Sequence, residues 1–239
     1  MNVKNEILEI MREWAPEDTA EEWDNVGLQL DTKRDIQRIA LVLEINLDTL
    51  SIIKEYPYDF IVSHHPLIFK PLHSLGYDGW FQQTLRALIQ DDIGLYVSHT
   101  NLDRASEGVT HALLRQLDLS IDKTDTLSDG YGKLVHLVKP IDFSDVDEQL
   151  DAVAKIVPDN LNIKTIALMG GSGKSFVKDV IQANADLYIT GELGYHDMQF
   201  LRQENKAVIL LGHYQSEVFI LDTIHEKLKH LDIEIDIIK

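Results

Sequence analysis

The sharpest chemical signal in the sequence is a pair of adjacent histidines, His64 and His65, in the motif SHHP. Successive side chains of a strand point to opposite faces, so adjacent histidines inside a regular strand could not serve one ion. Pro66 cannot continue a strand ladder and ends it directly after the pair. At such a strand end the two imidazoles can diverge towards two different metal ions, although two hydrogen-bonded surface histidines would give the same motif.

Two further motifs place a histidine four residues before an acid: His99 with Asp103 in HTNLD, and His213 with Glu217 in GHYQSE. Side chains at this spacing, across a loop and the first turn of a helix, can converge on one point. The chain has no cysteine, so a metal site must use imidazole and carboxylate ligands, which suit zinc, iron, manganese or nickel. A helix cap or a surface pair explains most single instances of the spacing. Its occurrence twice favours a site for two divalent ions, in which a carboxylate can bridge the cations.

The elements that must position these motifs show an internal repeat. Residues 39–66 and 166–193 align without a gap at a shift of 127, so that Asp59 falls on Asp186. Each segment is typical of a strand, a helix and a second strand. The second strands, DFIVS and DLYIT, are short apolar runs of the kind found in strands covered on both faces. Downstream, the strands GLYV and AVILL lead into the two motifs with a histidine and an acid.

The repeat predicts an α/β fold of two related halves, at residues 1–126 and 127–239, each with a mostly parallel or mixed sheet. Ligands of such sheets collect outside the carboxyl ends of the strands. The second half has Gly191 and Glu192 in place of the histidine pair, so one asymmetric two-metal centre between the halves is expected rather than two independent sites.

Three residues near these strand ends are candidates for proton transfer: Glu192, His99 and His196. For Glu192 and His196, the alternative is an acid at the start of a helix beside a histidine that has its own partner.

Two other motifs are expected to be structural. The segment GGSGKSF at 170–176 lacks the spacing of a phosphate-binding loop, which needs glycine at the position of Leu168. It is predicted to be a tight strand-to-helix turn, although its free N–H groups could still hold an anion. The segment WDNVGLQL at 23–30 is expected to be a packed turn in which Asp24 or Asn25 bonds the backbone.

Composition argues against several classes of partner. The chain of 239 residues carries 22 basic and 40 acidic residues, a formal net charge of -18. This charge repels phosphate backbones and anionic lipid, so nucleic-acid and membrane-surface partners are not expected. The sequence shows neither a signal core nor an apolar run near the ~18 residues of a membrane helix, so a cytoplasmic protein is expected.

In this order, the motifs EEWDNVGLQL, SHHPLIF, SHTNLD, DLYITGE and GHYQSE resemble the Nif-three-like family, often labelled GTP cyclohydrolase 1 type 2 homologues. The resemblance covers nearly the whole chain. It implies two related α/β halves in each subunit, a toroid of six identical subunits and dinuclear metal centres. The family's metal ligands fall on the residues that spacing already selects: His64, His65, Asp103, His213 and Glu217. The family often has a histidine pair after TGE, whereas this chain has only His196 there.

Residues and resemblance together favour a metal-dependent hydrolase acting on a small phosphorylated or nucleotide-like molecule. Two neighbouring cations can lower the pKa of a bound water to about 7 and so produce hydroxide at neutral pH. A metal-binding, metal-delivery or regulatory scaffold protein would use the same ligands without turnover. A purely structural metal site fits poorly, because such sites are usually closed by four ligands, often cysteine.

Overall fold

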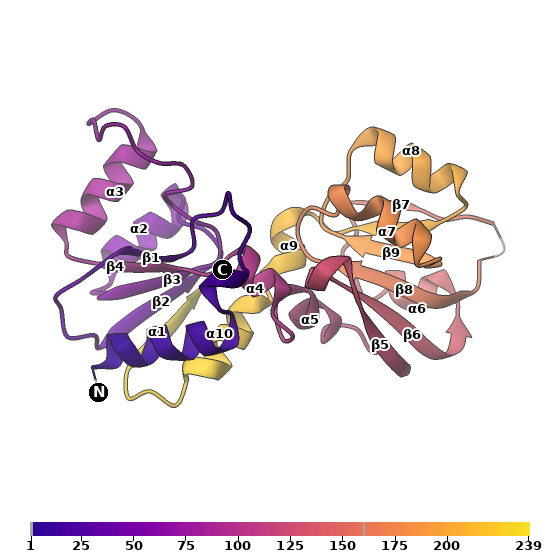
Figure 1. The fold of residues 1–239 in the computed structure, drawn as a ribbon, viewed down its shortest axis with the longest axis horizontal. Helices are drawn as coiled ribbons and strands as arrows, with labels where there is room; N and C mark the ends of the chain where they lie inside the picture. Colours follow the sequence, from indigo (N-terminus) through magenta and orange to yellow (C-terminus); the bar gives the residue numbers. More distant parts are fainter. Residues whose placement is uncertain (1, 160) are drawn as a thin grey trace. The chain divides into compact units, whose positions relative to one another are not determined.

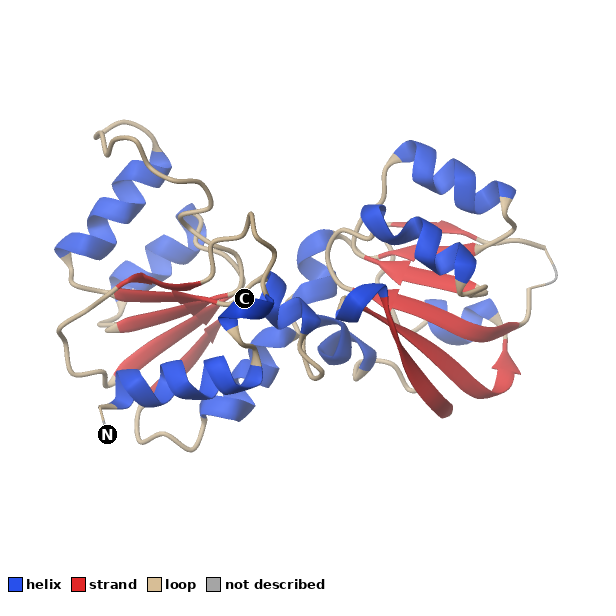
Figure 2. Cartoon of the chain, in the orientation of Figure 1, coloured by secondary structure: helices blue, strands red, loops and turns tan. Residues whose placement is uncertain are grey.

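A computed structural model describes residues 2–159 and 161–239, which form two compact α/β units (Figure 1). The first unit combines Met1–Leu102 with Leu221–Lys239, and the second is Asp103–Ile220. Each unit is built around one mixed sheet with helices packed against it (Figure 2). The predicted α/β class with mixed sheets is confirmed.

The compact units are divided differently from the predicted halves at 1–126 and 127–239. The last strand of the chain, β11 (Glu234–Ile238), pairs with a strand of the first sheet, and most of the preceding helix also belongs to the first unit. The units follow packing, whereas the halves follow the order of motifs along the chain.

The sheet of the first unit has the strand order β1-β4-β3-β2-β11. Its remaining strands are β1 (Gly27–Leu30), β2 (Arg38–Val42), β3 (Phe60–Ser63) and β4 (Gly94–Val97). All neighbours run parallel except β1, which is antiparallel to β4. Val42 pairs with Ser63, and Ser63 with Val97, so the carboxyl ends of three strands share one edge of the sheet.

Helices cover both faces of this first sheet (Figure 1). They are α1 (Val3–Trp14), α2 (Leu47–Glu55), α3 (Trp80–Gln90) and α10 (Ile220–Leu228). Ile53 of α2 and Leu85 of α3 pack into one core cluster with residues of β2, β3 and β4. The short helix α4 (Thr100–Arg104) follows β4, and a 3-10 turn, η1 (Glu17–Thr19), follows α1. Every residue of β3 and β4 is buried, as their apolar runs predict.

The sheet of the second unit has the strand order β5-β6-β8-β9-β10-β7. Its strands are β5 (Ile121–Leu127), β6 (Gly132–Ile141), β7 (Ala154–Ile156), β8 (Ile163–Met169), β9 (Leu187–Thr190) and β10 (Ala207–Leu210). The three strands β8, β9 and β10 run parallel, and the others are antiparallel to their neighbours.

The two faces of the second sheet have separate cores. The helices are α5 (Val109–Leu114), α6 (Phe143–Asp147), α7 (Val177–Gln182), α8 (Tyr195–Gln203) and α9 (His213–Glu217), with 3-10 turns η2 (Ser128–Gly130) and η3 (Lys174–Phe176). One core contains Leu113 of α5 and Ile166 of β8, and the other contains Leu201 of α8 and Ala167 of β8. Consecutive residues of β8 thus enter opposite cores, as expected for a strand covered on both faces.

The aligned aspartates of the predicted repeat have the same role in the two units. Asp59 accepts hydrogen bonds from the backbone amides of Gln37, at 2.9 Å, and Arg38, at 3.1 Å. Asp186 accepts them from the backbone amides of Lys164, at 2.9 Å, and Thr165, at 2.8 Å. The donors are related by the same shift of 127 residues. This equivalence supports the alignment, and the duplication itself stays a prediction.

Within the described ranges, no helix has both the length and the apolar character needed to cross a bilayer.

Candidate functional site

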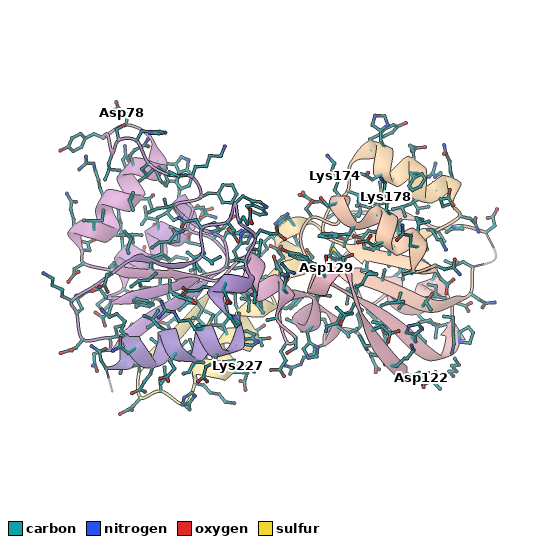
Figure 3. The ribbon with its side chains drawn as sticks, viewed as in Figure 1. Asp78, Asp122, Asp129, Lys174, Lys178 and Lys227 are labelled. Carbon is teal, nitrogen blue, oxygen red and sulfur yellow. The ribbon has the colours of Figure 1, made fainter. Side chains whose placement is uncertain are left out.

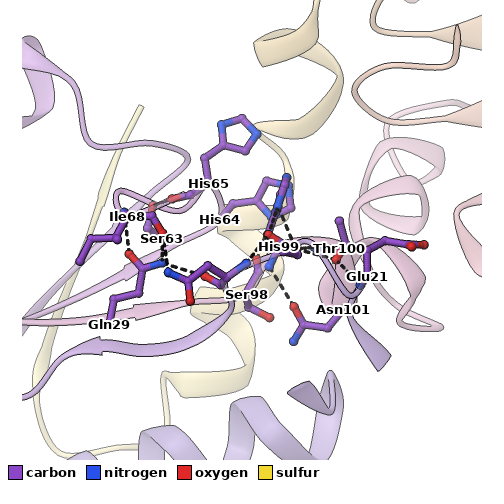
Figure 4. Close-up of polar contacts among 12 residues, drawn as sticks. Glu21, Gln29, Ser63, His64, His65, Ile68, Ser98, His99, Thr100 and Asn101 are labelled. Atoms are coloured by element: carbon purple, nitrogen blue, oxygen red, sulfur yellow. Dashed lines mark hydrogen bonds and ion pairs between the residues drawn. The ribbon is translucent and has the colours of Figure 1, made fainter. Parts of the chain in front are cut away.

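His64 follows β3 and has a fixed orientation. Its backbone amide donates to the carbonyl of Val42 at 3.1 Å, and that of His65 to the carbonyl of Leu43 at 2.7 Å, so bonding to the segment after β2 continues two residues past the strand. The side chain is fully buried, and Nδ1 lies 2.9 Å from the carbonyl oxygen of Ser98 (Figure 4). A carbonyl can only accept, so Nδ1 carries the proton. In the neutral ring, Nε2 then holds the lone pair that a cation would bind.

His65 and His99 lie beside this ring in the first unit. The imidazole centroids of His64 and His65 are 4.9 Å apart, and that of His99 is 5.3 Å from the first and 5.5 Å from the second. Each of the three rings offers a nitrogen within 4.8 Å of the others, so this group could hold a metal ion. The strand end therefore brings together not only the predicted histidine pair but also His99, for which the sequence predicts proton transfer.

Asp24 holds His99, a contact that sequence reasoning missed. Both carboxylate oxygens of Asp24 lie 3.0 Å from Nδ1 of His99, and one also accepts from the amide and hydroxyl of Thr100, at 3.0 and 2.6 Å. Burial favours the neutral carboxyl, but the bonds from His99 and Thr100 outweigh it and lower the pKa of Asp24 to about 2. Asp24 therefore bonds the backbone, as predicted. Its carboxylate also gives the His99 ring a charged partner, which was not predicted.

In the second unit, His213 begins α9 and contacts two acids. Its Nε2 lies 3.3 Å from Oε2 of Glu217, whose side chain is buried, and its Nδ1 lies 3.2 Å from Oε1 of Glu192. The bond with Glu217, opposed by burial and reinforced by Glu192, raises the pKa of His213 to about 9. The predicted spacing of four residues does bring this imidazole and this carboxylate together.

The glycine-rich segment 170–176 makes room for Glu217. A Cβ atom added to Gly171, whose φ is +62°, would lie 2.1 Å from Oε1 of Glu217. The amide of Gly171 also donates to Oγ of Ser216 at 2.9 Å. This close approach explains the glycine at 171 without a nucleotide. Lys174 lies in η3 with an exposed side chain, which Figure 3 shows at the surface of the second unit.

The remaining predicted residues are less closely defined. Asp103 is partly buried on α4, four residues beyond His99. His196 is exposed near the start of α8, where its ring lies 5.4 Å from that of Tyr195. Among the described residues, no hydrogen bond or ion pair joins His196 to Glu192. The structure therefore gives His196 no direct contact with the other predicted proton carrier of its unit.

The sequence profile of the family described as Duf34/NIF3 (NGG1p interacting factor 3) matches residues 1–239. The chain belongs to the NIF3 family. The predicted resemblance is confirmed. Because the match spans both compact units, the histidine and acid motifs of each unit belong to one family pattern.

Proteins similar to this chain match it over almost its whole length. A Clostridium perfringens protein named GTP cyclohydrolase 1 type 2 homolog is 31% identical, with 98% of this chain and 94% of that protein covered. The structure of reduced HcgD from Methanocaldococcus jannaschii is 29% identical, with a TM-score of 0.85 and coverage of 99% and 97%. A Bacillus cereus protein related to NIF3 gives a TM-score of 0.85 at 18% identity, covering 98% and 96%, and so shows the shared fold.

Proposed function

We propose that this NIF3-family chain binds two divalent metal ions and hydrolyses a small nucleotide-like or phosphorylated substrate. The observation that supports metal binding is the imidazole pair of His64 and His65, whose ring nitrogens lie within 4.8 Å of each other and of a His99 nitrogen in a chain without cysteine. In the proposal His64 and His65 bind metal, and His99, which Asp24 holds, is kept for proton transfer. Imidazole and carboxylate donors suit zinc, iron, manganese or nickel. The proposed ligands are those of the sequence analysis: His64, His65, Asp103, His213 and Glu217.

The surroundings of these residues fit metal binding. Ser98 holds the proton of His64 on Nδ1, which is the arrangement that orients a histidine ligand. Glu217 is a buried carboxylate beside His213, and a carboxylate of this kind can bridge two cations. Two divalent cations, when bound, lower the pKa of water to about 7 and so supply a nucleophile at neutral pH.

Proton transfer is proposed for His99 and Glu192. Asp24 fixes the ring of His99, so its other nitrogen can take up or release a proton without reorientation. The side chain of Glu192 is 57% exposed and contacts His213, so it can exchange protons with water. His196, which lies on the following helix, remains a third predicted carrier.

The substrate class rests on the relatives and on charge. The Clostridium perfringens relative carries a name that refers to a nucleotide, GTP. The net charge of -18 disfavours polyanions, so a small phosphorylated molecule is proposed rather than a nucleic acid.

Metal content tests the proposed ligands. Purified wild-type protein is expected to hold close to two ions per chain by elemental analysis, and His65→Ala and Glu217→Ala are expected to lose most of them. Loss of a ligand weakens affinity more than the roughly 10–100-fold that follows loss of a supporting residue. His73→Ala and Glu204→Ala, at exposed positions, are the matched controls. Full metal content in the ligand variants would contradict the site.

Turnover tests the hydrolase itself. Metal-loaded protein is incubated with a panel of nucleotides and phosphoesters, and hydrolysis that disappears on chelation supports the proposal. If no compound is hydrolysed while both metal ions are present, the metal-binding or metal-delivery alternative is favoured instead.

A further inference from the structure

Two exposed aromatic side chains lie next to the histidine group of the first unit. Trp23 is 59% exposed and Phe69 43% exposed. Their ring centroids are 5.8 Å apart, with an interplanar angle of 64°. The indole ring of Trp23 is in turn 6.3 Å from the imidazole of His99, at 73°. Ring contacts thus run without a break from Phe69 through Trp23 to His99.

The loops that carry these rings are tied to each other. The amide nitrogen of the Asn25 side chain donates to the carbonyl of Ile68 at 2.5 Å, and that of Gln29 donates to the same oxygen at 2.9 Å. The amide of Ile68 donates back to Oε1 of Gln29 at 2.9 Å (Figure 4). The carboxylate of Asp24, next to Trp23, is anchored on His99. Polar bonds therefore fix the backbone next to both exposed aromatic residues.

Such an arrangement is suited to a ligand. Large aromatic side chains that stay in water forgo the free energy of burial, and these two contact each other directly beside the histidine group. An exposed indole offers a face on which a planar ring stacks with little dependence on the ring's identity.

We propose that Trp23 and Phe69 form a stacking surface for a planar heteroaromatic ring, such as a purine, and hold the attached group at the histidines. This inference rests on the proposed function, because the ring positions a substrate at the proposed metal ligands. A mononucleotide suits the surface better than a nucleic acid, given the charge of -18. The aromatic pair would then determine which substrates bind, while metal ions held by the proposed ligands would act on the attached group.

Tryptophan fluorescence and equilibrium dialysis test the surface, with guanosine monophosphate as the probe and ribose phosphate as the ring-free control. We expect guanosine monophosphate to quench wild-type fluorescence and ribose phosphate not to. Trp23→Leu should abolish most of the quenching, and Trp23→Leu and Phe69→Leu should each weaken binding about 10-fold, as loss of one stacking partner does. Trp80→Leu is the matched control, because Trp80 is 49% exposed on α3.

Metal analysis of the same samples separates this inference from the proposed function. A Trp23→Leu protein that keeps its metal and binds guanosine monophosphate as tightly as wild type overturns the stacking surface and leaves the hydrolase untouched. Absence of binding to wild-type protein by guanosine monophosphate, adenosine monophosphate and a pterin overturns it as well. Light scattering covers the remaining case: if Trp23→Leu changes the oligomeric state without affecting binding, the surface is a contact between copies and the inference is wrong.

Discussion

Both carboxylate oxygens of Asp24 lie 3.0 Å from Nδ1 of His99, and the Asp24 side chain is fully buried. The bonds from His99 and Thr100 outweigh the effect of burial and hold the pKa of Asp24 at about 2, below its usual 3.8. A carboxyl whose pKa is lower in the folded chain stabilises the fold above its unfolded pKa. That contribution is lost as the pH falls through the folded value.

Asp24→Asn is therefore expected to lower the free energy of unfolding by about 2–3 kcal/mol at neutral pH, from a pKa lowered by about two at 1.36 kcal/mol for each unit. The difference from wild type should shrink as the pH falls from about 4 towards 2, because the wild-type carboxyl is then protonated too. Urea unfolding of both proteins across this range measures it. Asp122→Asn, an exposed position on β5, is the control. A difference that does not change with pH would show that Asp24 acts through packing alone.

Gly171→Ala should disrupt the second unit's predicted ligands without replacing any of them. Its Cβ would lie 2.1 Å from Oε1 of Glu217, so this carboxylate must move. The residue's φ of +62° adds a backbone cost of about 1–2 kcal/mol for alanine. We expect lower metal content and a lower melting temperature. Gly76→Ala is the matched control, because nothing lies within 4 Å of its added Cβ. A Gly171→Ala protein with full metal content would separate Glu217 from the metal site.

The elements that sequence could predict are those with a local signal. DFIVS and DLYIT became β3 and β9 because uninterrupted apolar runs suit strands buried on both faces. The His213–Glu217 contact follows from helical spacing. Asp24 and His99 are 75 residues apart, and neither segment carries a pattern that specifies the other. The pairing of β11 with β2 was also not predictable, because nothing in the sequence EIDII specifies a partner strand almost 200 residues earlier in the chain.

The glycine-rich segment shows how a local pattern can mislead. GGSGKSF combines the residue types of a phosphate loop, and only the spacing at Leu168 argues against one. The need for glycine at 171 comes from Glu217, which lies 46 positions further along the chain. A spatial constraint of this kind leaves no periodicity in the sequence.

Lys174→Ala should leave both the fold and the metal content unchanged. Lys174 is exposed, and Leu168 stands where a phosphate-binding loop needs glycine. Elemental analysis, thermal unfolding and nucleotide triphosphate binding are the three measurements. Tight binding of ATP or GTP in wild type that disappears in Lys174→Ala would restore the nucleotide-loop interpretation.

The chain is expected to assemble into a ring of six copies, as its resemblance to the family implies. Light scattering after size exclusion should then give about six times the chain mass of 27.3 kDa. A stable monomer at micromolar concentration would contradict the expectation.

The last prediction concerns Glu192, whose Oε1 lies 3.2 Å from Nδ1 of His213. If Glu192 transfers protons, Glu192→Gln should lower kcat roughly 10²–10⁴-fold while both metal ions stay bound. Glutamine keeps an oxygen that can accept from Nδ1, so the orientation of His213 is preserved while the exchangeable proton is lost. If Glu192 only orients His213, Glu192→Gln should keep kcat and metal content, and Glu192→Ala, which removes the acceptor oxygen, should lower metal affinity by roughly 10–100-fold. Parallel measurement of kcat and metal content separates these roles, with Glu204→Gln as an exposed control. No change in either quantity in either variant would remove Glu192 from the mechanism, and proton transfer would then fall to His99.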